Sequence, residues 1–184
     1  FVGGGRFTLS RSLVTDNTAQ GDGGGGLLLN RAGDDTDAPE PRATVVDSTF
    51  FENSVSGEDA EGGAMLNLVG SLTVRQSTIV GNSSESDSDG IAAHGNPEED
   101  PEATEPPPLR ETVLLSSIIY NNRSDDEDDS ATDLAVIGED VPGAEEGDDP
   151  VPLLSSFVSL GWNIYGAFEP RFEGAAEDLG NVDP

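Results

Sequence analysis

Polar and apolar positions recur along the chain in an eleven-residue pattern. Four segments share it, at residues 7–17, 43–53, 72–82 and 111–121. In each segment the third position is aliphatic and the eighth is large and apolar, and the first strand of the pattern alternates as a half-buried strand does. The second and third segments start 29 residues apart, at residues 43 and 72. A pattern that returns at such a period predicts a solenoid of stacked structural repeats.

Three columns of the pattern hold the same polar residue in all four segments. The second position is threonine (Thr8, Thr44, Thr73, Thr112), the sixth is serine (Ser12, Ser48, Ser77, Ser116) and the eleventh is asparagine (Asn17, Asn53, Asn82, Asn121). Parallel strands stack at about 4.8 Å, which would place each column in a line. We therefore expect these residues to form structural ladders. The asparagines would lie at a corner, bond the backbone of neighbouring repeats and tolerate a left-handed conformation.

A weaker pattern follows each segment. A turn sequence, usually rich in glycine, precedes a short apolar run at residues 27–29, 64–66, 91–93 and 134–137. Each repeat is therefore predicted to contain three short strands separated by turns. This arrangement is typical of a right-handed parallel β-helix. We predict an all-β fold of this class with about four to five coils, forming one segment over residues 1–184. The first residue, Phe1, and the last, Pro184, indicate a piece of a longer protein.

Some of these motifs resemble a known family. Phe50-Phe51-Glu52-Asn53 followed by Gly62-Gly63-Ala64-Met65 resembles the paired FxxN and GGA(I/L/V) motifs of the polymorphic outer membrane proteins of chlamydiae. The sequence is also similar to bacterial and archaeal surface β-helix proteins, and residues 159–166 and 180–184 resemble the passage that closes their arrays. The resemblance implies a secreted or surface-displayed, non-enzymatic stalk or adhesin, and it supplies no catalytic residues.

Charge changes this picture of the surface. The chain has 37 acidic residues against eight arginines and no lysine, for a formal charge of -29. Such a surface excludes nucleic acid as a partner, because phosphate contacts need basic residues. Of the 37 acids, 24 lie in three insertions at residues 31–42, 83–108 and 123–150. Diffuse acidity without lysine favours adaptation to high salt, since at about 1 M the Debye length falls to roughly 3 Å.

Calcium binding is the competing explanation of the acidity. Glu85, Asp87 and Asp89 alternate before Gly90, like the start of a calcium loop. The twelfth position would be Asn96 instead of a bidentate glutamate, so the EF-hand pattern fails. An acidic corner is the preferred interpretation, and a calcium-dependent adhesin is kept as an alternative.

Catalytic chemistry has little support in the sequence. The chain has no cysteine and a single histidine, His94, so neither a thiolate site nor a histidine cluster exists. Polysaccharide lyases and glycoside hydrolases also use β-helices, and Asp47 with Glu52 is the carboxylate pair such an enzyme would need. These two residues are expected at opposite ends of a corner, without a basic partner. We therefore predict a non-enzymatic protein with no cofactor.

Partners and location follow from the same features. Uncapped solenoid ends present pairing edges, so self-association into a filament is one expectation, and a cell-surface or glycan partner is another. No apolar run approaches the roughly 18 residues needed to span a bilayer. We expect an extracellular or cell-surface location. Asn82 and Asn122 both begin glycosylation sequons; the ladder would bury Asn82, which leaves Asn122 as the candidate acceptor.

Overall fold

The computed structural model describes residues 1–21, 23–30, 39–57, 60–85, 89–94, 111–123, 133–137 and 157–166. Every element within these ranges is a β-strand, and every strand pair is parallel. The strands form four sheets, and each strand pairs with its counterpart in the preceding or following repeat. The architecture is all-β and consistent with a parallel β-solenoid.

The four sheets are numbered here in the order in which the chain enters them. The first sheet contains β1 (Arg6–Ser10), β5 (Arg42–Val46), β9 (Ser71–Arg75), β13 (Glu111–Leu115) and β16 (Phe157–Ser159). The second contains β2 (Leu13–Thr15), β6 (Thr49–Phe51), β10 (Thr78–Val80), β14 (Ile118–Tyr120) and β17 (Ile164–Tyr165). The third contains β3 (Thr18–Gln20), β7 (Ser54–Ser56) and β11 (Ser83–Ser84). The fourth contains β4 (Leu27–Leu29), β8 (Met65–Asn67), β12 (Ile91–His94) and β15 (Leu134–Ile137).

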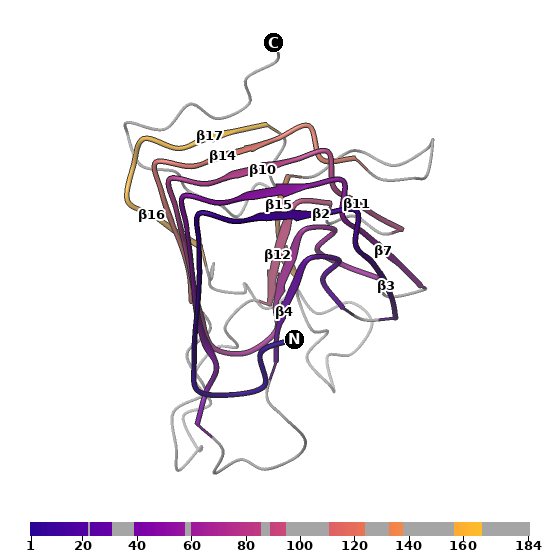
Figure 1. The fold of residues 1–184 in the computed structure, drawn as a ribbon, viewed down its shortest axis with the longest axis horizontal. Helices are drawn as coiled ribbons and strands as arrows, with labels where there is room; N and C mark the ends of the chain where they lie inside the picture. Colours follow the sequence, from indigo (N-terminus) through magenta and orange to yellow (C-terminus); the bar gives the residue numbers. More distant parts are fainter. Residues whose placement is uncertain are drawn as a thin grey trace, which may run out of the picture.

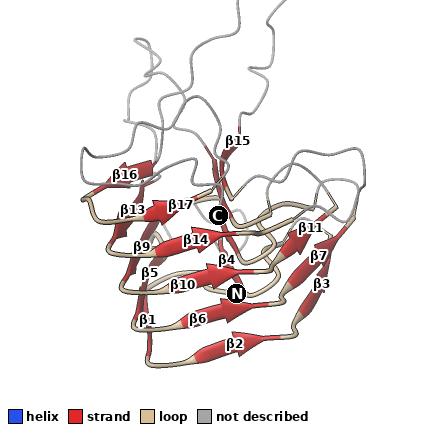
Figure 2. Cartoon of the chain, turned by 90° about the horizontal axis from the view of Figure 1, so that it is seen from above, coloured by secondary structure: helices blue, strands red, loops and turns tan. Residues whose placement is uncertain are grey.

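Successive repeats follow nearly the same outline. In Figure 1 the outlines nest, and the strands of one sheet lie directly beside one another along the stack. Figure 2 shows this most clearly for β2, β6, β10, β14 and β17. The prediction of three strands per repeat is wrong, because the repeat has four: β5, β6, β7 and β8 all belong to one 29-residue period. The strand missed is the one after the asparagine, which has only one apolar residue in β7, Val55, and so lacks a hydrophobic pattern.

The core lies between the sheets and is built from columns of inward-facing side chains. The first sheet supplies Val45, Val74 and Leu114; the second supplies Phe50, Ile79, Ile119 and Tyr165; the fourth supplies Leu27, Met65, Ile91 and Leu134. Each column continues through the stack because the strands pair without a shift in register. Burial of these side chains removes apolar surface from water at about 25 cal/mol per Å². Hydrophobic stabilisation is therefore distributed along the stack and depends on neighbouring repeats.

Two corners flank the second sheet, and both use left-handed backbone. Before this sheet the residues with positive φ are Arg11, Asp47, Gln76, Ser116 and Trp162, and after it they are Asp16, Glu52, Gly81 and Asn121. The predicted left-handed asparagine is therefore displaced. In the first three repeats the residue before the asparagine takes this conformation, and the asparagine side chain is free to point inward. Glycine occupies one of these nine positions, Gly81, and Asn or Asp, which tolerate this conformation best among the other residues, occupies three.

The fourth repeat stands one residue out of the register predicted from the pattern. Thr112 lies opposite Leu72 and points into the core, whereas Val113 lies opposite Thr73. The doublets at 116–117, 118–119 and 121–122 let the serine, apolar and asparagine positions of the pattern fit either register, and the threonine position alone favours the predicted one. A one-residue slip exchanges the two faces of a strand. The structural register buries Leu114 and Ile119; Thr112 is accommodated because its Oγ1 accepts a hydrogen bond from Asn67 Nδ2 at 3.0 Å.

Parts of the acidic insertions also belong to the sheets. Strands β11 and β12 lie within 83–108, and β15 lies within 123–150. The remaining positions of these insertions, and most of 31–42, fall outside the described residues apart from short flanking stretches. Within the described part of the chain, no helix is long and apolar enough to cross a membrane.

Candidate functional site

An asparagine ladder runs through the corner after the second sheet. It consists of Asn17, Asn53, Asn82 and Asn122 and ends at Asp133. In every step the side-chain Nδ2 and the backbone N–H of one residue donate to the same oxygen of the next, with Nδ2 to oxygen distances of 2.6 to 2.8 Å. All members after Asn17 are buried. The ladder satisfies backbone groups that the corner leaves without strand partners.

The end of this ladder corrects two expectations. Asn122, not Asn121, occupies the fourth position, and Asn121 is the left-handed residue beside it. Asn122 is fully buried and donates to Asp133 Oδ1 through both its backbone and its side chain. The folded chain therefore does not present Asn122 as a glycosylation acceptor, and this prediction is wrong. A carboxylate suits the last position because it accepts hydrogen bonds and has no N–H group needing a further partner.

A serine ladder occupies the other corner. Its members are Ser12, Ser48, Ser77 and Ser117, and it ends at Asn163. Each serine Oγ donates to a carbonyl oxygen two residues earlier in its own repeat. The Oγ atoms of Ser48, Ser77 and Ser117 also accept the backbone N–H of the preceding member at 3.2 to 3.4 Å. The predicted Ser116 lies one residue away and is exposed. Both ladders are structural, since their polar atoms bond the protein itself.

The candidate calcium residues do not converge in the described part of the chain. Asp89 is buried and its Oδ1 accepts from the backbone N–H and the hydroxyl of Ser84, both at 3.2 Å. Glu85 accepts the backbone N–H of Gly57 at 2.8 Å. Asp87 lies outside the described residues. No group of three or more acidic or histidine side chains close enough to hold a metal occurs among the described residues.

The candidate enzyme residues are also separated. Asp47 and Glu52 occupy the two left-handed corners at opposite ends of β6. His94 ends β12, and its Nε2 lies 3.8 Å from Glu61 Oε2. The carboxylates of Asp47 and Glu52 therefore do not face each other across a shared cavity.

The outer face of the first sheet carries the most unusual charge. Of the five arginines that the structure describes, Arg6, Arg42 and Arg75 lie on this face, where Glu111 is the acidic residue among the described strands. Arg6 and Arg42 pair directly across β1 and β5. The same column continues with Ser71 on β9 and Glu111 on β13. A positive site thus stands on a chain whose overall charge is strongly negative.

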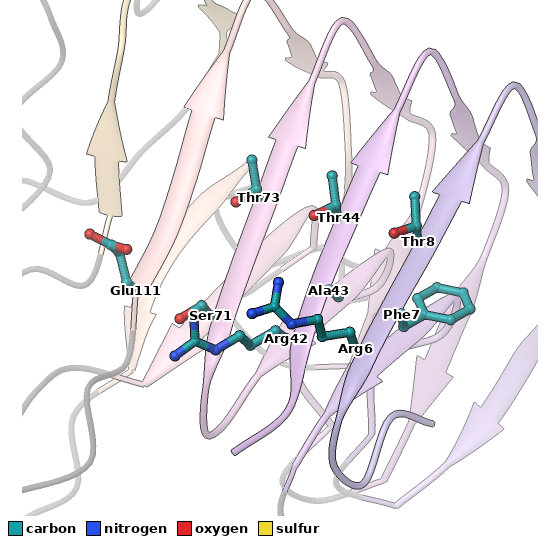
Figure 3. Close-up of a pocket in the computed structure, with 9 residues that line it drawn as sticks. All are labelled: Arg6, Phe7, Thr8, Arg42, Ala43, Thr44, Ser71, Thr73 and Glu111. Atoms are coloured by element: carbon teal, nitrogen blue, oxygen red, sulfur yellow. The ribbon is translucent and has the colours of Figure 1, made fainter. Parts of the chain in front are cut away.

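We call this site the arginine groove. It is an open hollow of about 320 Å³, and its lining includes Arg6, Arg42, Ser71 and Glu111 together with the hydroxyl groups of three threonines (Thr8, Thr44, Thr73). Figure 3 shows both arginine side chains reaching along the sheet toward the strand of Glu111, with the threonines in a row beside them. Neither arginine forms an ion pair with a carboxylate that the structure describes. The groove therefore offers two guanidinium groups and a row of hydroxyls to solvent.

Sequence reasoning missed the two arginines because they lie just before the eleven-residue pattern. Their signal was nevertheless present, since Arg6 and Arg42 stand at equivalent positions, one residue before the segments at 7–17 and 43–53. The threonine column was found, and the structure pairs Thr8 with Thr44 and Thr44 with Thr73 on the outer face. Thr112 does not join them.

Comparison of the chain with family models, curated proteins and solved structures finds no match.

Proposed function

We propose that the chain is a segment of a right-handed parallel β-helix of about four to five coils, and that it serves as a non-enzymatic structural or adhesive part of a secreted or cell-surface protein. The observation that carries the proposal is the pair of buried polar ladders. They connect each repeat to the next through hydrogen bonds of 2.8 Å in the asparagine ladder and 3.3 to 3.4 Å in the serine ladder, which favours a stiff rod with fixed spacing. The resemblance to surface β-helix proteins at residues 50–53 and 62–65 supports the same function.

The groove composition favours binding over catalysis. Glycoside hydrolysis uses two carboxyl groups about 5 to 9.5 Å apart, and the described lining of the arginine groove includes one carboxylate, Glu111. A rod that displays charged and hydroxyl groups at regular intervals is suited to holding a partner at a surface. Loops and faces on a rigid scaffold commonly carry such binding.

The acidic composition supports operation in high salt. With 37 acidic residues and no lysine, the folded chain repels itself at low ionic strength. Screening over roughly 3 Å at about 1 M salt removes most of this repulsion. The same acids would bind calcium only if several converged at one place.

Thermal melts followed by circular dichroism, combined with sedimentation, test the proposal. The chain is compared in low salt, in about 1 M KCl, and in low salt with millimolar CaCl₂ or MgCl₂. We expect KCl to raise the Tm strongly and the two divalent salts to have small and equal effects. Rescue by calcium but not by magnesium would instead favour the calcium-dependent adhesin. Release of reducing or unsaturated ends from acidic polysaccharides would contradict the non-enzymatic function.

A further inference from the structure

We infer that the arginine groove binds carboxylate groups of an acidic polysaccharide, which deepens the proposed adhesive function and rests on it. The two guanidinium groups stand on adjacent strands, β1 and β5, in direct register. Strand spacing places their backbones about 4.8 Å apart. A single carboxylate lying between them accepts hydrogen bonds from both side chains.

The cost of the pair indicates that it has a ligand. Like charges directly opposite one another in a sheet are destabilising. Arg6 and Arg42 are both exposed, and within the described residues neither is neutralised by an ion pair. Glu111 shares their column but stands two strands beyond Arg42. An anion bound between the guanidinium groups removes this repulsion.

The residue type also identifies the chemistry of the ligand. The planar guanidinium presents N–H groups in a fixed fork that matches the two oxygens of a carboxylate. This pairing tolerates salt better than a solvated ammonium, because directed hydrogen bonds accompany the charge. All eight basic residues of the chain are arginine, and two of them form this groove.

The floor of the groove favours a sugar polymer over a peptide. Thr8, Thr44 and Thr73 place hydroxyl groups in a line beside the arginines, on the outer face of the first sheet. These groups can exchange hydrogen bonds with sugar hydroxyls at successive repeats. Bound peptides are held mainly by sheet edges or apolar pockets, whereas the groove lies on the face of the sheet, where β5 and β9 are paired on both sides and only β1 has an open edge.

Binding of defined polymers to the intact chain tests the inference. The probes are polygalacturonate, which carries carboxylates, dextran sulfate, neutral dextran and poly-glutamate. Affinity is measured by isothermal titration at the lowest salt concentration at which circular dichroism shows the chain folded. We expect polygalacturonate to bind more tightly than the other three. Tighter binding of dextran sulfate would overturn the carboxylate assignment, and tighter binding of poly-glutamate would overturn the polysaccharide assignment.

Variants locate the binding. The double substitution Arg6→Gln and Arg42→Gln should weaken polygalacturonate binding by about 10- to 100-fold, since each guanidinium contributes charged hydrogen bonds. The charge-matched control is Arg11→Gln with Arg123→Gln, which lies outside the groove and should change affinity by less than about 3-fold. Replacing both groove arginines with lysine should give an intermediate loss, because lysine keeps the charge but not the fork.

Three results would overturn the site: no binding of polygalacturonate, equal losses in the groove and control variants, or full affinity in the groove variant. Cleavage of the polymer during the titration is a separate result. It would refute the non-enzymatic function while leaving the location of the carboxylate site to be decided by the variants.

Discussion

Replacement of Asn82 by alanine should destabilise the protein severely. Asn82 is fully buried in the middle of the asparagine ladder. Its Oδ1 accepts from Asn53 through the backbone N–H at 3.0 Å and Nδ2 at 2.8 Å. Its own Nδ2 donates to the carbonyl oxygens of Phe50 and Val80, both at 3.2 Å, and to Asn122 Oδ1 at 2.8 Å. Alanine removes all five hydrogen bonds, four of which are buried.

The magnitude follows from the groups left without partners. Asn53 Nδ2 keeps a second acceptor, the carbonyl oxygen of Val14 at 3.0 Å, but the buried backbone N–H of Asn53 loses the Asn82 oxygen. The carbonyl oxygen of Phe50 loses a donor at the same time. Each buried unsatisfied group costs about 1 to 3 kcal/mol, and the small cavity adds to this. We expect a loss of about 3 to 5 kcal/mol, a large part of the total stability of a domain.

The matched control is Asn17→Ala at the exposed end of the same ladder. Asn17 is exposed, and its Nδ2 donates to Thr15 O and Asn53 Oδ1. In the alanine variant the backbone N–H of residue 17 can still donate to Asn53 Oδ1. We expect a loss of about 1 kcal/mol or less. Urea unfolding at fixed molar salt, followed by circular dichroism, gives both free energies of unfolding, with unchanged m-values as the check on two-state behaviour. Losses that agree within about 0.5 kcal/mol would refute the idea that a buried ladder holds the repeats together.

Two further pairs of variants test the register and the core. Asn122→Ala should lower the free energy of unfolding by about 3 kcal/mol, because Asn122 belongs to the buried ladder. Asn121→Gly should be nearly neutral, since glycine is relaxed at the φ of 54° that Asn121 adopts. Urea unfolding measures both variants, and a larger loss for Asn121→Gly than for Asn122→Ala would restore the register predicted from the pattern. Phe50→Ala should cost about 3 to 5 kcal/mol, because this side chain is 1% exposed. Phe51→Ala should cost less than about 1 kcal/mol, because Phe51 points outward and is 38% exposed; similar midpoint shifts for the two would place the core on the wrong face of β6.

The stacking of parallel strands was readable from the sequence because the eleven-residue pattern encodes it directly. Each repeat has an inward aliphatic residue in the first sheet and an inward apolar residue in the second, such as Val74 and Ile79. Buried Asn53 and Asn82 mark the corner between the strand of the second sheet and the strand that follows it. Local chemistry and long-range pairing agree at these positions, so the pattern alone predicts the ladders of the first three repeats.

The rest depended on three-dimensional packing. Neighbouring doublets at 116–117, 118–119 and 121–122 leave the register of the fourth repeat ambiguous, and only burial of Leu114 and Ile119 decides it. The third sheet was missed because its strands have too few apolar residues for a period to be seen. The arginine groove was missed because Arg6 and Arg42 lie one residue outside the eleven-residue pattern. The register of β1 and β5 brings these two residues, 36 positions apart in the chain, directly opposite each other.

Cross-linking in the fourth repeat tests the stacked register most directly. The chain has no cysteine of its own, so two introduced thiols report on one distance without background. Val113 lies opposite Thr73 on the outer face, whereas Thr112 faces the core opposite Leu72. With a short bifunctional thiol reagent, Thr73→Cys combined with Val113→Cys should cross-link rapidly, because in-register neighbours are about 4.8 Å apart. Thr73→Cys combined with Thr112→Cys should react slowly. If the second pair cross-linked faster than the first, or if neither pair cross-linked, the result would contradict the parallel, in-register stack on which the ladders, the core and the arginine groove all depend.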